Sequence, residues 1–290
     1  MIRTVITDMD GSLLRRDGHI SPAVRRAVKG LEERGIRFLV CTGRTLCEAR
    51  SVLEPAGIFC DMICMNGAAA YRRDGTLLWK HPISGRAVSQ ILAAAAGEGI
   101  VIQLTTDRGD YIVGDQGEFE DFFCTYIFPY CGVAREQYKE ALGQYCLISA
   151  EGFLRKGLEV YKAAVLSGRR ERLEETGPAL KRIEGVSVSS SYSTNWEITH
   201  WQADKGRALE EYAAREGLKL KEIMAVGDGD NDVFMLSLPL GRSVAMGNGT
   251  EKAKAAAGMV TAGNDEDGFA KAVERMEQEE DKDEARKGLV

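Results

Sequence analysis

Two aspartates near the amino terminus have the types and spacing needed for chemistry on a phosphate group. Asp8 and Asp10 directly follow the apolar run 5–7, and Gly11 comes next. Residues two apart in an extended chain point to the same side, so one carboxylate could attack phosphorus while the other handles a proton. The two negative charges repel a phosphate unless a cation intervenes, and oxygen ligands alone favour a hard ion. The pair therefore predicts Mg²⁺-dependent phosphoryl chemistry.

Three further segments carry groups suited to the same task. Thr42-Gly43-Arg44 offers a hydroxyl and free amides just before a predicted helix, an arrangement that binds anions. Lys205 stands at the start of another predicted helix and brings a compact positive charge suited to phosphate. The segment 227–232 follows an apolar run and adds a dense group of carboxylates. Its polar members are Asp228, Asp230, Asn231 and Asp232.

Each segment taken alone also has an ordinary explanation. The first pair of aspartates could be a turn device, and Lys205 could lie on a solvated helix face. The acidic segment could be a calcium loop, which needs Gly at its sixth position and Glu at its twelfth. Val233 and Pro239 stand at those positions, so the calcium loop is excluded. Taken together, four such segments in one order, each at a strand end or a helix start, predict a single phosphate site.

The elements that must position these groups alternate as strand and helix. In an open parallel sheet, ligands bind at the carboxyl edge of the strands, which is where three of the four segments fall. The chain is therefore expected to form an α/β fold, a Rossmann-like parallel-sheet core with helices on both faces. The predicted core strands are 5–7, 38–41, 62–65, 223–226 and 242–245, and the predicted core helices are 22–34, 45–53, 203–216, 231–236 and 265–276.

The alternation changes in the middle of the chain. A hairpin around Asp74-Gly75 is followed by helix-then-strand units, which predicts an inserted α+β domain with an antiparallel sheet. The expected bounds are 1–81 and 194–290 for the core and 82–193 for the insert. An aromatic-rich stretch at 119–130 is expected to pack the insert's core or to form a dimer contact. The charge run 279–284 is expected to be a helix end or a disordered tail.

Composition limits the other classes of protein. The 290 residues are 44% hydrophobic and 28% charged, with a formal net charge of -6 and no basic stripe, which argues against a nucleic-acid or anionic-membrane surface. No apolar stretch reaches the ~18 residues of a membrane span, and the first residues lack a signal-peptide pattern. The seven cysteines show no regular spacing. These observations predict a cytoplasmic protein. The phosphate motifs above make a small phosphorylated molecule the expected partner, and the expected state is a monomer or homodimer.

The motifs as a set resemble a known family. Asp8-Met9-Asp10-Gly11-Ser12, Thr42-Gly43-Arg44, Lys205-Gly206 and the segment 227–232 are similar to the four motifs of haloacid dehalogenase-like (HAD) phosphatases. Met65-Asn66-Gly67-Ala68, Ala245-Met246-Gly247-Asn248 and the run 260–268 are similar to the Cof-type subfamily, which has a large α/β cap. The resemblance covers essentially the whole chain, although across the cap it concerns only length and layout.

The resemblance implies a role for each matching residue. Asp8 would be the nucleophile that forms an aspartyl-phosphate, and Asp10 would be the general acid/base. Mg²⁺ would be bound by Asp8, the backbone carbonyl of Asp10 and Asp228, with Asp232 serving the metal's hydration shell. The transferring phosphoryl group would be held by Thr42, Gly43 and Lys205, with Ser12, Arg44 and Asn231 completing and orienting the phosphate site.

Two positions depart from the family pattern, and two other functions remain open. Ser12 stands where Thr is usual and keeps the hydroxyl, whereas Asp204 stands before Lys205 where Ser or Asn is more frequent. The carboxylate of Asp204 could weaken the field of Lys205 or point to solvent. The sequence predicts a Mg²⁺-dependent phosphatase of small phosphomonoesters, such as sugar phosphates. A phosphomutase with the same chemistry and a non-hydrolytic phosphometabolite-binding protein are the alternatives. A dinucleotide-binding domain is disfavoured because no GxGxxG turn follows the first strand.

Overall fold

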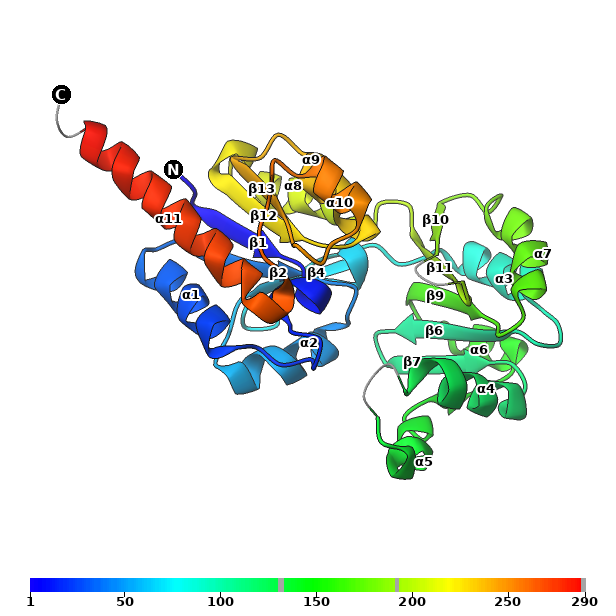
Figure 1. Ribbon diagram of the computed structural model, residues 1–290. Coiled ribbons are helices and arrows are strands. Elements are labelled where there is room, and N and C mark those ends of the chain that lie inside the picture. Colours follow the sequence, from blue (N-terminus) through cyan, green and yellow to red (C-terminus); the bar gives the residue numbers. More distant parts are fainter. Residues whose placement is uncertain (130–132, 191–192, 288–290) are drawn as a thin grey trace. The chain divides into compact units, whose positions relative to one another are not determined.

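The chain folds into two compact units. The computed structural model describes residues 1–129, 133–190 and 193–287 (Figure 1). One unit, called the core unit here, consists of Met1–Lys80 and Gln202–Val290. The other unit, the insert, is His81–Trp201. The chain thus returns to the core at Gln202, later than the expected residue 194, because the last strand of the insert's sheet extends beyond that point.

The core unit contains a mainly parallel sheet in the order β14-β13-β12-β1-β2-β3-β4-β5. β1 lies in the middle and pairs in parallel with β12 on one side and β2 on the other. Because β1 is covered on both edges and both faces, all its residues are buried. The strands are β1 (Thr4–Thr7), β2 (Arg37–Cys41), β3 (Asp61–Cys64), β4 (Ala69–Tyr71), β5 (Leu77–Lys80), β12 (Ile223–Gly227), β13 (Arg242–Ala245) and β14 (Met259–Val260).

Helices cover both faces of this sheet, as predicted. On one face, Ile6 and Leu39 pack with Leu209 of α8 and Met235 of α9. On the other face, Phe38 of β2 meets Phe269 of α11 edge to face, with ring centroids 5.9 Å apart. The helices are α1 (Pro22–Glu33), α2 (Leu46–Leu53), α8 (Lys205–Arg215), α9 (Val233–Ser237), α10 (Glu251–Ala256) and α11 (Gly268–Lys287).

The last helix is longer than the predicted 265–276. α11 continues through the charge run 279–284, because basic side chains of the core hold its acidic face. The Arg34 guanidinium donates to both carboxylate oxygens of Asp281 at 3.0 and 3.3 Å, and Arg242 pairs with Glu279. Of the two expectations for this run, a helix end and a disordered tail, the structure supports the helix.

The insert has its own sheet in the order β10-β11-β9-β6-β7-β8, with helices packed against it. The strands are β6 (Val101–Thr106), β7 (Gly109–Val113), β8 (Cys146–Leu147), β9 (Val160–Leu166), β10 (Val186–Ser189) and β11 (Asn195–His200). The helices are α3 (Gly85–Ala94), α4 (Gln116–Phe122), α5 (Tyr138–Leu142), α6 (Ala150–Lys156) and α7 (Arg170–Leu180).

β11 explains why the insert ends later than expected. This strand pairs antiparallel with both β9 and β10, so its residues belong to the insert's sheet rather than to the core. The expected boundary at 194 cut through this sheet. The aromatic-rich stretch was expected either to pack the insert's core or to form a dimer contact, and the structure shows the packing. Its buried members are Phe119, Phe122, Phe123 and Phe128. Tyr130 lies outside the described residues.

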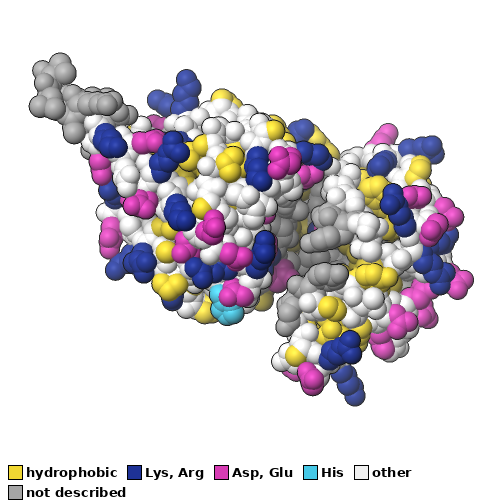
Figure 2. Space-filling view, in the orientation of Figure 1, with side chains coloured by type: hydrophobic (Ala, Val, Ile, Leu, Met, Phe, Trp, Pro, Cys, Tyr) yellow, Lys and Arg dark blue, Asp and Glu magenta, His cyan; other side chains and the backbone are white. Residues whose placement is uncertain are grey.

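Surface charge is mixed in sign. Figure 2 shows Lys and Arg side chains interspersed with Asp and Glu over both units on the face drawn. Among the described residues, no helix combines the length and the apolar character that crossing a bilayer requires.

Candidate active site

The topology of the core sheet brings the predicted motifs to one edge. Asp8 comes directly after β1, Thr42 directly after β2 and Asp228 directly after β12. The three strands are parallel neighbours, with Thr7 in register with both Val40 and Val226, so they end at the same level. Lys205 begins α8 on one face of this sheet. Segments almost 200 residues apart in sequence therefore meet at the carboxyl edge of the strands.

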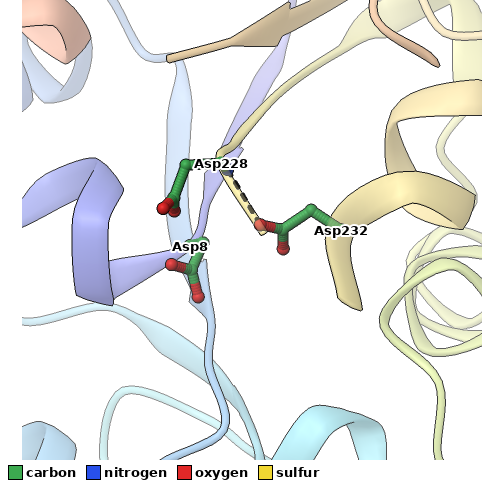
Figure 3. Close-up of side chains that lie close together, drawn as sticks. All are labelled: Asp8, Asp228 and Asp232. Atoms are coloured by element: carbon green, nitrogen blue, oxygen red, sulfur yellow. Dashed lines mark hydrogen bonds between the residues drawn. The ribbon is translucent and has the colours of Figure 1, made fainter. Parts of the chain in front are cut away.

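Three carboxylates and one ammonium form the centre of the site. Asp8, Asp228 and Asp232 each place a carboxylate oxygen within 4.8 Å of the others (Figure 3). The Nζ of Lys205 donates to Asp8 Oδ1 at 2.6 Å and to Asp232 Oδ1 at 2.7 Å. Both Lys205 and Asp232 are 0% exposed, and Asp8 is 5% exposed. The cluster is therefore a group of three acids, two buried and Asp228 partly buried, around a single fixed cation.

Burial and this imbalance of charge together shift the pKa values of the cluster. Burial raises the pKa of Asp8 well above its usual value, and the carboxylates of Asp232 and Asp228 add to the rise while Lys205 opposes it. Burial and the neighbouring Asp232 raise the pKa of Asp228 to about 6. Burial would lower the pKa of Lys205, but Asp232 and Asp8 outweigh it and raise that pKa above its usual value. Lys205 is thus charged, and the cluster has more negative charge than one ammonium can offset.

The residues around the acids hold them in place. Asp232 Oδ2 accepts the backbone N–H groups of Asp228 and Gly229 at 2.9 and 2.8 Å, which folds the acidic loop back on itself. Ser12 Oγ donates to Asp228 Oδ1 at 2.9 Å. Gly11 has φ of 82°, and a Cβ there would lie 2.2 Å from Asp228 Oδ2. Glycine is therefore required at this position both for its backbone and for the space it leaves to Asp228.

A divalent cation fits this cluster. All the candidate side-chain ligands are carboxylate oxygens, the donors that Mg²⁺ prefers in proteins. A bound dication would also offset the neighbouring carboxylate charges that, together with burial, raise the pKa values of Asp8 and Asp228. Among the described residues, this is the group of acids that the geometry singles out as able to hold a metal.

We expect Mg²⁺ to stabilise the protein more at pH 7.5 than at pH 5. The pKa of Asp228 is raised from 3.8 to about 6 in the folded protein. Between these pH values the folded state therefore binds more protons at Asp228 than the unfolded state does. The stability of the metal-free protein consequently falls as the pH rises from about 4 to about 6. Below about pH 6 protons compete with the metal. With one Mg²⁺ concentration at both pH values, ~100 times the dissociation constant measured at pH 7.5, thermal unfolding should show a rise in Tm on the order of 5 °C at pH 7.5 and a smaller one at pH 5. Equal shifts at both pH values, or an unchanged pattern in Asp228→Asn, would contradict this site.

The second motif lies beside the cluster, and Arg44 has an unexpected partner. The Arg44 guanidinium binds both carboxylate oxygens of Asp10, with Nε 2.8 Å from Oδ2 and Nη2 2.6 Å from Oδ1. The backbone N–H of Arg44 donates to Thr42 Oγ1 at 3.1 Å. The side chain of Asp10 is 57% exposed and is not one of the three clustered acids. The structure thus brings Arg44 to Asp10, and the proposed metal contact of the Asp10 carbonyl stays a prediction.

The structure also explains Asp204, the departure beside Lys205. Its Oδ1 accepts the backbone N–H groups of Gly206 and Arg207 at 2.8 and 3.1 Å, so Asp204 is the N-cap of α8. The carboxylate therefore satisfies the free amides of the helix that presents Lys205. The structure thus gives Asp204 a role in beginning the helix, and an effect of its charge on the field of Lys205 stays a prediction.

One residue at this edge received no individual role from the sequence. Asn66 Oδ1 accepts from Asn231 Nδ2 at 3.2 Å, and the Asn66 backbone N–H donates to Thr42 O at 2.9 Å. Asn66 and the preceding Met65 both have left-handed backbones, with φ of 55° and 51°. Asn66 therefore links the second motif to the acidic loop. The Asn-Gly pair directly after a predicted strand was the available signal, because Asn adopts positive φ more readily than most residues.

Comparisons with known proteins agree with this geometry. Residues 5–273 match the model of a family described as haloacid dehalogenase-like hydrolase. The chain is 28% identical over 285 residues to phosphatase YwpJ of Bacillus subtilis (strain 168), covering 95% of this chain and 100% of that protein. It is 26% identical over 301 residues to 5-amino-6-(5-phospho-D-ribitylamino)uracil phosphatase YwtE of the same organism, covering 95% and 98%. A solved haloacid dehalogenase-like hydrolase from B. subtilis is similar with a TM-score of 0.79 and 27% identity, covering 94% of this chain and 99% of that one.

Proposed function

Because the chain belongs to the haloacid dehalogenase-like hydrolases and is a phosphatase of their Cof-type subfamily, we propose that it hydrolyses small phosphomonoesters, such as sugar phosphates, with Mg²⁺. The observation that carries this proposal is the buried cluster of Asp8, Asp228, Asp232 and Lys205 at the strand ends. A protein that only binds a phosphometabolite needs no carboxylate aimed at the ligand beside a fixed ammonium. The cluster therefore favours catalysis over the binding alternative.

The first chemical step assigns the two leading aspartates different tasks. A carboxylate oxygen of Asp8 attacks phosphorus, the bond from phosphorus to the ester oxygen breaks, and that oxygen leaves with the proton that Asp10 donates. The products are the free alcohol and a phosphoryl group on Asp8. Lys205 fixes the Asp8 carboxylate through its 2.6 Å hydrogen bond and offsets charge on the transferring group. Thr42 and the amide of Gly43 hold the phosphoryl oxygens.

The second step returns the enzyme to its starting state. Asp10, now a carboxylate, takes a proton from a water molecule whose oxygen attacks the phosphorus. The bond between phosphorus and Asp8 breaks, inorganic phosphate leaves, and the Asp8 carboxylate is restored. When Mg²⁺ is bound by Asp8 and Asp228, with the Asp10 carbonyl and Asp232 in support, it supplies the neutralising charge that lets a carboxylate approach a phosphate.

The insert is proposed to select the substrate. Its sheet and helices form a separate compact unit that carries none of the four motifs. The relative YwtE is named for a ribitylaminouracil phosphate, and YwpJ only as a phosphatase, so the names support phosphomonoester hydrolysis without identifying the substrate. A phosphomutase would use the same cluster but return the phosphoryl group to the product instead of releasing phosphate.

We expect phosphate release from a panel of phosphorylated metabolites to require Mg²⁺. Activity should disappear with excess EDTA, return with Mg²⁺ and be poor with Ca²⁺, because Ca²⁺ takes more ligands at longer distances and would misplace the Asp8 oxygen. A malachite-green assay for free phosphate measures this directly. Isomerised sugar phosphate without free phosphate would establish the mutase, and full activity in EDTA would refute the proposed metal site.

A further inference from the structure

Two turns at the carboxyl edge of the core sheet have no part in the proposed chemistry. One is 246–250, which follows β13, and the other is 261–264, which follows β14. Both overlap the stretches that resemble the Cof-type subfamily, and neither contains an acidic or basic residue. Both nevertheless form hydrogen bonds with the backbone next to the proposed metal ligands, which indicates a supporting role in that site.

The residues after Asp8 form a turn whose central peptide matters for the metal. Asp10 has φ of -79° and ψ of 117°, and Gly11 has φ of 82° and ψ of -7°. These values match a type II turn with Asp10 and Gly11 at its centre. A type I turn differs by a flip of the peptide that joins the two central residues, and here that peptide contains the Asp10 carbonyl. The direction of this predicted metal ligand therefore depends on which turn the chain adopts.

Asn248 holds the next carbonyl of the same turn. Its Nδ2 donates to Gly11 O at 2.8 Å, and its Oδ1 accepts the backbone N–H of Asn264 at 2.8 Å. Asn264 is itself buried, and its Nδ2 donates to Leu14 O at 2.8 Å. Two asparagines that bind each other thus hold two carbonyls, three residues apart, in the segment that follows the proposed nucleophile.

The turn that carries Asn248 is also bonded to the other side of the site. The backbone N–H of Thr250 donates to Asp228 O at 2.8 Å. A Cβ at Gly249 would lie 3.1 Å from Asp228 Cα, so this turn packs directly against the backbone of the acid. The turn after β13 therefore connects Gly11 with Asp228, and Asn248 supplies the contact on the Gly11 side.

We propose that Asn248 and Asn264 are positioning residues of the metal site, because they fix the turn that sets the direction of the Asp10 carbonyl. This inference rests on the proposed Mg²⁺-dependent phosphatase function and adds two residues to its machinery. The asparagines act through the backbone of the turn and do not themselves bind the metal or the substrate. Mg²⁺ demands near-ideal octahedral geometry, so a displaced carbonyl lowers its affinity.

The test measures the Mg²⁺ dissociation constant of the free protein, by titration calorimetry and by the rise of Tm with Mg²⁺ concentration. Asn248→Ala should raise this constant by about 10- to 100-fold, the range found when a partner behind a metal ligand is removed. Asn264→Ala should act in the same direction. Neither residue has a positive φ, so alanine suits both backbones. Asn248 is also exposed, so its variant should fold even where loss of the buried Asn264 side chain is damaging.

Activity gives a second and separate measurement. With nitrophenyl phosphate, the Mg²⁺ concentration for half-maximal hydrolysis by Asn248→Ala should rise by the same factor as the dissociation constant. Its kcat at saturating Mg²⁺ should stay close to the wild-type value, because bound metal holds the carbonyl in place. A merely structural role would lower activity without this dependence on metal concentration.

Ser243→Ala is the matched control. Ser243 Oγ accepts the backbone N–H of Gly258 at 2.8 Å and so joins the segments of β13 and β14 at their amino ends, away from the metal site. Like Asn248→Ala, this substitution removes side-chain hydrogen bonding between these two parts of the chain. It should leave the Mg²⁺ dissociation constant unchanged. Metal-free thermal unfolding of each variant shows how much stability it has lost.

The outcomes separate this inference from the proposed function. An unchanged Mg²⁺ dissociation constant in folded Asn248→Ala would overturn the inference alone. So would an equal rise in Ser243→Ala, because a general loss of stability would then explain both variants. Wild-type protein that binds Mg²⁺ but hydrolyses no phosphomonoester, nitrophenyl phosphate included, would instead refute the phosphatase proposal, since the binding comparison does not depend on turnover.

Discussion

Asp8→Asn is expected to abolish phosphate release from every substrate. An amide cannot form the acyl phosphate, so the loss should be at least about 10⁴-fold and independent of the leaving group. The substitution removes one of the two carboxylates that bind the Lys205 ammonium and leaves Asp232 paired with it, so it should not lower the midpoint of thermal unfolding in the absence of metal. Steady-state assays and thermal unfolding of the same preparation measure the two effects.

A matched control is available in the same acidic loop. Asp230 pairs with Lys252 at 2.6 Å and accepts from Thr250, away from the three clustered acids. Asp230→Asn should therefore keep nearly full activity. Measurable turnover by Asp8→Asn, after contamination is excluded with a second preparation, would mean that another group attacks phosphorus.

Asp10→Asn is expected to slow the enzyme by an amount that depends on the leaving group. General acid/base help contributes about 10²–10⁴-fold, most of it when the departing oxygen is a poor leaving group. Hydrolysis of a sugar phosphate should fall within that range. Transfer from nitrophenyl phosphate to Asp8 should fall much less, because nitrophenolate needs little protonation. Burst kinetics of nitrophenol release distinguish this first step from turnover.

The same variant should accumulate the intermediate. Without Asp10 no group activates the attacking water, so the phosphoryl group should remain on Asp8 after nitrophenyl phosphate has reacted. Acid-quench mass spectrometry would find one added phosphoryl group on the peptide that contains Asp8. Asp17→Asn, an exposed acid a few residues further on, serves as the control. Equal losses with both substrates and no trapped phosphoenzyme would show that the roles of Asp8 and Asp10 are assigned wrongly.

Much of the core could be predicted from sequence because its signals are local. The apolar run before Asp8 and the run before Asp228 identify buried strands, and parallel strands end at one edge of a sheet. The motifs that follow them had to meet once the strand order was right. Ser21 and Pro22 likewise predict the start of α1, where Ser21 Oγ accepts from the Val24 N–H at 3.1 Å.

Other features depend on contacts between distant residues, which a single sequence does not show. Lys205 could have been a solvated helix residue, and its complete burial follows only from the positions of Asp8 and Asp232 across the edge. The pairing of Arg44 with Asp10 joins two motifs that were interpreted separately. β11 was missed because its membership in the insert is decided by pairing with β9 rather than by its own pattern.

The central position of β1 in the sheet has a consequence for folding during translation. Thr4 pairs in register with Ile223, so one neighbour of the strand that leads to the nucleophile is translated 219 residues after it. At roughly 5–20 residues per second, that neighbour arrives about 10–45 s later. During that interval the insert can complete its own sheet while one edge of the apolar strand β1 stays unpaired. An unpaired edge is a template for association with other chains. We therefore expect the protein to need a chaperone most while it is still being translated and β12 has not yet been made. In the finished molecule the same strand is completely buried.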